Sequence, residues 1–266
     1  MINATLYLRE MKKSVKILII FGAIITMYVC IIMGMYNPEM MKTLDGFYET
    51  MPELMASVGM NAGASSLLEF MVSYLYGFIL LIFPMVFSIL RGNGLVAKYT
   101  DSGAMAVLVS APVKRRTIIL SQLSVLLSGV LLLLLYATGL ELLVANNKFP
   151  GELVTSDLLK LNLALLFLQL FISGICFLAS CLFSDTKNSI AFGAGVPAFM
   201  FVLQMLANVG GKAEKVKYFT FFTLFDANGI VAGEVNAFLY SIVLLVGAIV
   251  LFGIGIEIFC RKDLCL

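Results

Sequence analysis

The sequence predicts an all-α membrane protein in which a single domain, residues 1–266, crosses the bilayer six times. Of the 266 residues, 61% are hydrophobic and only 13% are charged, whereas a soluble domain has about 25% charged residues. A spanning helix needs about 20 apolar residues. Six segments reach that length: residues 17–35, 67–90, 117–145, 161–183, 189–209 and 238–259.

The stretch before the first span has the pattern of an amphipathic helix. Asn3 is a suitable N-cap, Leu6 supplies apolar surface, and Arg9, Lys12 and Lys13 gather near the other face. This pattern is typical of a helix that lies on a membrane surface. An ordinary basic flank of the first span is the alternative.

Two spans contain proline and one is longer than a bilayer needs. Pro84 and Pro197 lie inside the second and fifth spans, where proline is tolerated and usually causes a local kink. The third span is long enough that we expect it to tilt or to project at one end.

The cations are distributed unevenly between the two sides of the predicted bundle. Lys and Arg concentrate in cytoplasmic loops, and a cytoplasmic N-terminus places twelve of the 18 cations inside. We therefore expect a multi-pass cell-membrane protein, of bacterial type, with both termini in the cytoplasm. The six outside cations in this topology are Lys42, Lys148, Lys160, Lys212, Lys215 and Lys217.

The largest inside loop, residues 91–116, predicts a short helix followed by a break. Asp101 or Ser102 is a suitable N-cap, and residues 104–109 are apolar with helical composition. Pro112 interrupts the run, because the residue before proline disfavours the α region. We expect Pro112 to lie in the first turn of the third span.

Three consecutive cations, Lys114, Arg115 and Arg116, follow that proline. They occupy the helix end that the dipole makes unfavourable for cations, so helix stability does not explain them. A positive-inside signal, anionic headgroups and an acidic protein partner all remain open. Nucleic-acid binding is not expected, because no larger basic domain surrounds the patch.

The composition excludes several kinds of chemistry. The chain has no His and no CxxC, which removes zinc sites, HExxH proteases and Ser-His pairs. It also lacks GxxxxGK[ST], so it has no P-loop of its own. We therefore expect no catalytic residue, no metal and no cofactor bound by this chain.

Polar side chains within the spans allow two interpretations. Glu141, Gln169 and Gln204 either line a path through the membrane or form interhelical hydrogen bonds. For Glu141, which lies only five residues before Asn146, the sequence leaves open a side chain that simply reaches the interface and a substrate or proton role. Glu257 has Arg261 four residues on, a spacing that favours a structural ion pair.

Four stretches give the chain a family resemblance. They are "LYLREMKKSVKILII" (residues 6–20), "DSGAMAVLVSAPVKRRTIILSQ" (101–122), "FFTLFDANGIVAGE" (221–234) and "FCRKDL" (259–264). In this order, with six spans, they resemble the ABC-2 type permeases, the membrane subunits of ATP-driven exporters. The resemblance covers essentially the whole chain.

The resemblance implies three special elements. The N-terminal one is an amphipathic elbow helix that includes Leu6, Arg9, Lys12 and Lys13. The second is a pair of short re-entrant helices between spans five and six, which includes Phe221, Phe222, Phe225 and Asp226; an interfacial aromatic belt is the alternative there. The third is a cytoplasmic coupling helix, with these residues toward the ATPase: Asp101, Gly103, Met105, Leu108, Ser110, Pro112, Arg115 and Arg116.

The resemblance also implies partners and a function. The permease pairs with a second copy or a paralogue and binds two ABC ATPase subunits, on which ATP and magnesium act. Membrane lipids and an exported substrate complete the assembly. The expected cargo is amphipathic or hydrophobic: a peptide, a lipid-like molecule or an antibiotic. Alternatives are a peptide-binding immunity or sensing component of the same architecture and, less favoured, an ion-coupled secondary transporter, which predicts paired mid-membrane charges.

Overall fold

The computed structural model describes residues 2–37, 46, 48–60, 64 and 66–262, so Lys42 and the last two residues of "FCRKDL" lie outside it. Every element assigned in these residues is helical. Six helices are long and apolar enough to cross a membrane, which confirms the predicted all-helical membrane architecture. Those six are α1 (Ala4–Gly34), the segmented second span (Leu67–Asp101), α8 (Arg115–Lys148), α9 (Thr155–Leu182), α10 (Thr186–Asn208) and α12 (Val235–Arg261).

The second span is built from α4 (Leu67–Met71), a π-helical turn η1 (Val72–Tyr76) and α5 (Ile79–Leu95). A short helix, α3 (Pro52–Ser57), precedes it. The backbone of Gly59, with φ at +80°, crosses the span at Gly77. A Cβ at Gly77 would stand 2.7 Å from the carbonyl oxygen of Val58, so this crossing requires glycine.

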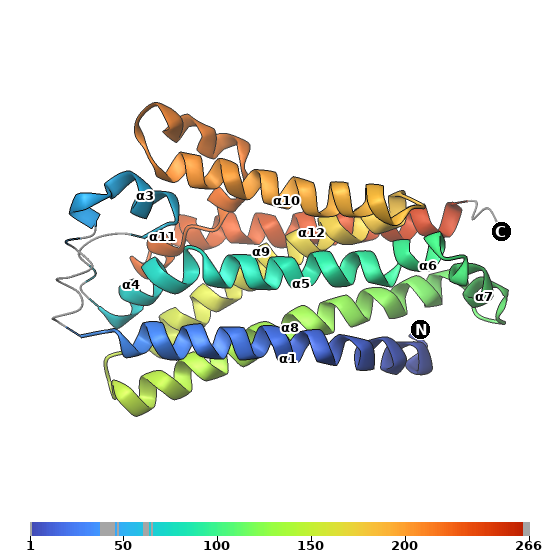
Figure 1. Ribbon diagram of the computed structural model, residues 1–266, viewed down its shortest axis with the longest axis horizontal. Coiled ribbons are helices and arrows are strands. Elements are labelled where there is room, and N and C mark those ends of the chain that lie inside the picture. The colour runs from blue at the N-terminus through green and yellow to red at the C-terminus, as the bar shows by residue number, and fades with distance from the viewer. Residues whose placement is uncertain (1, 38–45, 47, 61–63, 65, 263–266) are drawn as a thin grey trace.

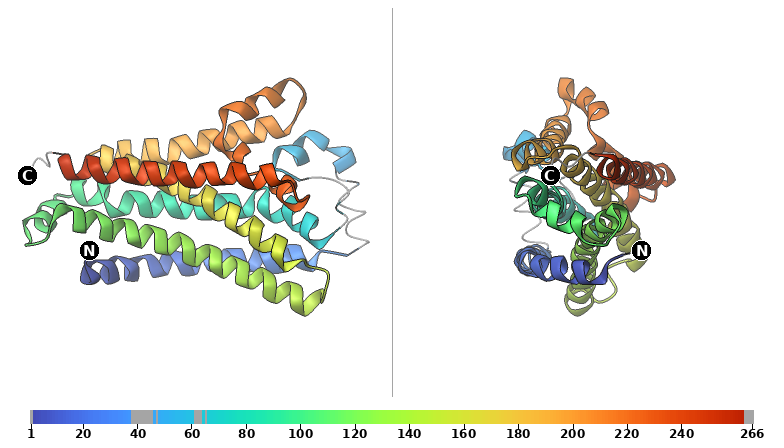
Figure 2. Two further views of the ribbon diagram at one scale, coloured as in Figure 1. Left: turned by 180° about the vertical axis from the view of Figure 1, so that it is seen from behind. Right: turned by 90° about the vertical axis from the view of Figure 1, so that its right-hand side faces the viewer.

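Helix α9 lies at the centre of the bundle and packs against α12, α5, α10 and α8. Figure 2 shows it crossing between the other helices. In the most apolar windows of the second span, α8 and α9, 61% or more of the residues are buried, against 22–28% in α1, α10 and α12. Helices α1, α10 and α12 therefore form the periphery that a bilayer would surround.

Pro84 does not break α5, because a side chain from α9 satisfies the carbonyl that it leaves free. Proline has no N–H, so the carbonyl of Leu80 loses its helical donor. The Nε2 of Gln169 lies 3.3 Å from that oxygen and donates to the carbonyl of Leu81 at 2.9 Å. Gln169 is thus an interhelical hydrogen-bond donor, one of the two roles that its position allowed.

The start of α1, the end of α12, and the short helices α6 (Ala97–Asp101) and α7 (Ala104–Ser110) share one end of the bundle, which we call the α7 end (Figure 1). The predicted short helix in this loop is confirmed. Its predicted cap is wrong: Asp101 ends α6, Ser102 follows it, and Gly103 precedes α7 with φ at +71°. Only glycine adopts that conformation without strain.

Pro112 also lies differently from the prediction. Ala111 and Lys114 are extended, and α8 begins only at Arg115, so Pro112 belongs to a linker and not to the first helical turn. Helix α8 is 34 residues long, about 51 Å at 1.5 Å per residue. This exceeds a hydrocarbon core of about 30 Å, as expected for the third span.

The opposite end, which we call the α3 end, holds the remaining short elements: η2 (Gly211–Phe219), η3 (Phe221–Leu224) and α11 (Ala227–Val231). η2 turns back along α10 (Figure 1). At the other end, the expected elbow segment is continuous with the first span, since α1 runs unbroken from Ala4. Asn3 caps it as predicted, accepting from the backbone N–H of Leu6 at 3.0 Å.

The Gln169 bond predicts a coupled pair of substitutions. Gln169→Leu should lower the free energy of unfolding by about 1 kcal/mol, because the Leu80 carbonyl then has no donor. In a Pro84→Ala background the loss should shrink, since residue 84 regains its N–H. Denaturant unfolding in detergent measures both.

Gln122 provides the matched control. It is also fully buried, but neither of its amide atoms has a hydrogen-bond partner. Gln122→Leu should therefore be neutral or stabilising. Equal losses for Gln169→Leu with and without Pro84 would contradict the proposed compensation.

Candidate functional site

Helix α7 is attached to the bundle by one face and leaves the other uncovered. Met105 is 2% exposed and packs in a cluster with Leu95, Ile118 and Phe177, and Leu108 packs against the same cluster. Val107, on the other face, is 73% exposed. Of the residues expected to meet an ATPase, Met105 and Leu108 thus face inward, while Asp101, Gly103, Ser110 and Pro112 are exposed.

The cations after Pro112 divide into two kinds. Arg115 Nη1 donates to the carbonyl of Lys262 at 3.0 Å, at the C-terminal end of α12, where the helix dipole favours a cation. Lys114 and Arg116 are exposed. Arg115 therefore has a structural partner that the sequence did not reveal, and the other two remain free for a surface.

Lys262 extends this contact to a third helix. Its Nζ donates to the carbonyls of Cys181 and Leu182 at 3.2 and 2.8 Å, at the C-terminal end of α9. Partial burial lowers the pKa of this ammonium group. The start of α8 and the ends of α12 and α9 are thereby joined in one cluster.

A second cluster joins the start of α1 to the loop that carries α7. Glu10 is 1% exposed, and its carboxylate accepts from Lys13 Nζ at 2.7 Å and from Tyr99 Oη at 2.6 Å. Arg91 Nη2 lies 3.6 Å from the other carboxylate oxygen. We call Glu10, Lys13, Arg91 and Tyr99 the latch. It connects α1, α5 and α6.

The remaining residues of the expected elbow lie as an amphipathic pattern requires. Leu6 and Tyr7 pack against the cluster around Met105, whereas Arg9 and Lys12 are exposed. Tyr7 Oη also donates to Ser128 Oγ on α8 at 3.0 Å. The first turns of α1 are therefore fixed to α8.

At the α3 end lies a cavity of about 940 Å³. Aromatic and methionine side chains supply much of its wall, with Gln204, Asn208, Lys217 and Asp226 among its polar groups. A hydrogen bond from Lys217 to Glu214 at 2.7 Å raises the pKa of Lys217. The cavity is thus mostly apolar, with a few convergent polar groups, as small-molecule sites usually are.

The aromatic segment expected to be re-entrant forms part of this wall. Phe222 and Phe225 are buried, and Phe221 stacks on Phe222 with ring centroids 4.7 Å apart. Asp226 caps α11 by accepting from the backbone N–H of Gly229 at 3.0 Å. The segment is thus packed against the bundle.

The polar side chains predicted within the spans differ in their partners and in their burial. Gln204 Oε1 accepts from Thr223 Oγ1 at 3.0 Å and so ties α10 to η3. Glu257 pairs with Arg261, which confirms the predicted ion pair. Of the alternatives left open for Glu141, the one in which it reaches the interface does not hold, because the side chain is fully buried against Tyr76 and Asn162.

The described residues contain no group of three or more His, Cys, Asp and Glu side chains that could hold a metal ion. Comparison of the chain with protein-family models, with curated proteins and with solved structures found no match.

Sequence reasoning missed Val107 and most of the latch. Glu10 follows directly on Arg9, and its sequence neighbours give no sign that it is buried. Arg91 and Tyr99 are distant in sequence from Glu10, and only the packing of α1 on α5 brings them together. The one available signal was an acid among cations, at the spacing of an ion pair with Lys13.

The latch predicts a contrast between two glutamates. Glu10→Ala leaves the guanidinium of Arg91, 9% exposed, without its carboxylate, which should cost about 3 kcal/mol of unfolding free energy. Glu257→Ala removes an ion pair whose side chains are 59% and 81% exposed, so the cost should stay below about 1 kcal/mol. Thermal unfolding in detergent compares them, and equal losses would contradict a buried latch.

Proposed function

We propose that this chain is the membrane-spanning subunit of an ABC exporter of the ABC-2 type, which couples ATP hydrolysis by separate ATPase subunits to export of an amphipathic or hydrophobic substrate. The observation that carries the proposal is α7: a short helix held to the bundle by Met105 while Val107 stays 73% exposed. Because α7 lies beyond the membrane bundle with Val107 uncovered, it offers an apolar contact to the groove of a soluble partner.

The connections of α7 support this role. The helix is followed directly by the linker into α8, and Arg115 at the start of α8 holds the end of α12. The latch ties the preceding helix, α6, to α1 and α5. A force applied to α7 therefore reaches four membrane helices through short polar contacts, which is what a coupling element requires.

The charge pattern supports an inward orientation for this end. The α7 end carries the latch lysine, Lys114, Arg116 and Arg261, and the positive-inside rule places such an end in the cytoplasm. In this orientation the cavity at the α3 end faces outward. Its volume of about 940 Å³ and its aromatic wall suit an amphipathic cargo that is leaving the membrane.

The first turns of α1 act as the elbow in this proposal, although they are continuous with the span. Their exposed cations, Arg9 and Lys12, are placed to meet anionic headgroups. The segment from η2 to α11 then acts as the re-entrant element at the exit.

A matched pair of valines tests the docking claim. Val107 on α7 and Val235 at the start of α12 are 73% and 74% exposed, at opposite ends of the bundle. Val107→Asp should reduce the amount of co-purified P-loop ATPase about tenfold, as expected for loss of roughly 1.4 kcal/mol. Val235→Asp should leave it unchanged, and both variants should insert normally into the membrane.

Substitutions of Arg115 and Arg116 add a second test, because the two arginines are expected to affect different properties. Arg116→Glu should weaken ATPase binding and reduce cargo-stimulated ATP hydrolysis without loss of stability, since Arg116 is exposed. Arg115→Gln should instead lower thermal stability, because the carbonyl of Lys262 loses its donor. Normal ATPase binding by Val107→Asp and Arg116→Glu would overturn the proposed function.

A further inference from the structure

Glu141 is the most deeply buried acid in the described part of the chain, at 0% exposed. Its Oε2 accepts two hydrogen bonds, from Tyr76 Oη and from Asn162 Nδ2, each at 2.9 Å. Asn162 Nδ2 also lies 2.7 Å from Tyr76 Oη. The other carboxyl oxygen, Oε1, and the amide oxygen of Asn162 are buried without any hydrogen-bond partner.

No described cation forms an ion pair with Glu141. On its own helix, Lys148 is two turns away, and its Nζ lies beside Gly34 of α1. On α9, the exposed Lys160 is hydrogen-bonded to Asp157 at 2.9 Å. The other cations of the elements packed around Glu141 belong to the α7 end, such as Arg91 in the latch and Arg115 beside Lys262. Along the rest of these elements, the titratable side chains include acids and phenols, which supply no positive charge: Tyr28 and Tyr36 on α1 and its C-cap segment, Glu69 and Tyr74 on the second span, Tyr136 on α8, Asp157 on α9, and Asp226 before α11.

An ionised carboxylate at this place would be a buried charge with two hydrogen bonds on Oε2 but with no cation and no donor at Oε1, which is a costly arrangement in a membrane protein. The site therefore requires one positive charge. A metal ion needs several oxygen ligands, and only two oxygens here are free. A proton needs no coordination shell, and a protonated Oε1 is a donor where the ionised form offers only acceptors.

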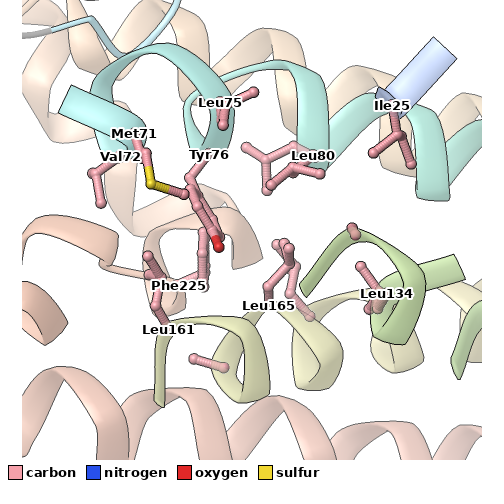
Figure 3. Close-up of a cluster of buried hydrophobic side chains, with 14 of the residues drawn as sticks. Ile25, Met71, Val72, Leu75, Tyr76, Leu80, Leu134, Leu161, Leu165 and Phe225 are labelled. Carbon is pink, nitrogen blue, oxygen red and sulfur yellow. The ribbon is translucent and has the colours of Figure 1, made fainter. Parts of the chain in front are cut away.

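Tyr76 connects this acid to the cavity. It is one of the residues that line the cavity, and its hydroxyl donates to Glu141 at 2.9 Å. Figure 3 shows the Tyr76 ring pointing from the second span toward α9, with its hydroxyl among Leu161, Leu165 and Phe225. Tyr76 ends the π-helical turn η1, and π-turns inside helices are frequent at functional sites.

We propose that Glu141 is a proton-binding site that opens to the cavity at the α3 end through Tyr76. The proton is held on the Glu141 carboxyl, in an O–H bond, while Tyr76 covers it. When the Tyr76 hydroxyl moves away and water from the cavity reaches the carboxyl, that bond breaks, the proton passes to water and the carboxylate remains. The site stands on the geometry of these three side chains and does not depend on the exporter proposal.

Infrared spectroscopy of the purified full chain tests this directly, because a protonated carboxyl has a C=O stretching band that a carboxylate lacks. At pH 7 the wild type should show this band, and labelling with carboxyl-¹³C glutamate should shift it. Glu141→Gln should abolish it, whereas Glu257→Gln, which changes an exposed and paired acid, should leave it intact. Tyr76→Phe should shift its frequency, because one hydrogen bond to the carboxyl is lost.

Absence of the band in the wild type at pH 7, or its persistence in Glu141→Gln, would overturn the proposal. If Glu141→Gln does not fold, Glu141→Asp tests whether the band belongs to residue 141, since the shorter acid keeps a carboxyl in altered surroundings. The band must then move, and an unchanged band would assign it to another residue. None of these readouts requires transport or ATP hydrolysis, so they remain valid if the exporter proposal fails.

Discussion

The structure depends on the requirement that polar groups inside a bilayer find their partners within the protein. Helix α9 meets it with polar side chains that recur every three, four or seven residues along its length. These side chains bond to residues of the second span, α8, α10 and α6: Asn162 to Glu141 and Tyr76, Gln169 to the carbonyls near Pro84, Ser173 to Ser88, Cys176 to the carbonyl of Gly193, and Ser180 to the N–H of Ala97. This polar face makes α9 the helix against which the others are positioned.

The same helix relates the two candidate sites to each other. Near its start, Asn162 holds Glu141 beside the cavity, and at its end the carbonyls of Cys181 and Leu182 accept from Lys262. Lys262 in turn accepts from Arg115, directly after the α7 linker. A rigid movement of α9 would change the contacts at both ends together. The arrangement thus offers a physical route by which the proposed docking at α7 would be coupled to access to the cavity.

The sequence predicted the spans, the short helix at residues 104–109 and the ion pair of Glu257 with Arg261, because hydropathy and helical spacing are local signals. Sequence-based prediction failed for features that depend on contacts between residues far apart in the chain. Gly103, not Asp101, precedes α7, Glu141 is buried although Asn146 follows it, and Arg115 bonds to the far end of the chain. The latch was missed for the same reason, since Glu10 and Tyr99 meet only when α1 packs on the second span. Roles that the family resemblance implies for these residues remain proposals.

The central claim is that the uncovered face of α7 meets a soluble ATPase, where the simplest alternative is a helix lying flat on lipid. A photo-cross-linking amino acid at position 107 measures this directly, because that side chain is 73% exposed in the isolated chain. The account predicts a covalent adduct with a P-loop ATPase, identified by mass spectrometry, and little adduct from the same probe at position 235. Adducts with lipid alone at position 107 would contradict it.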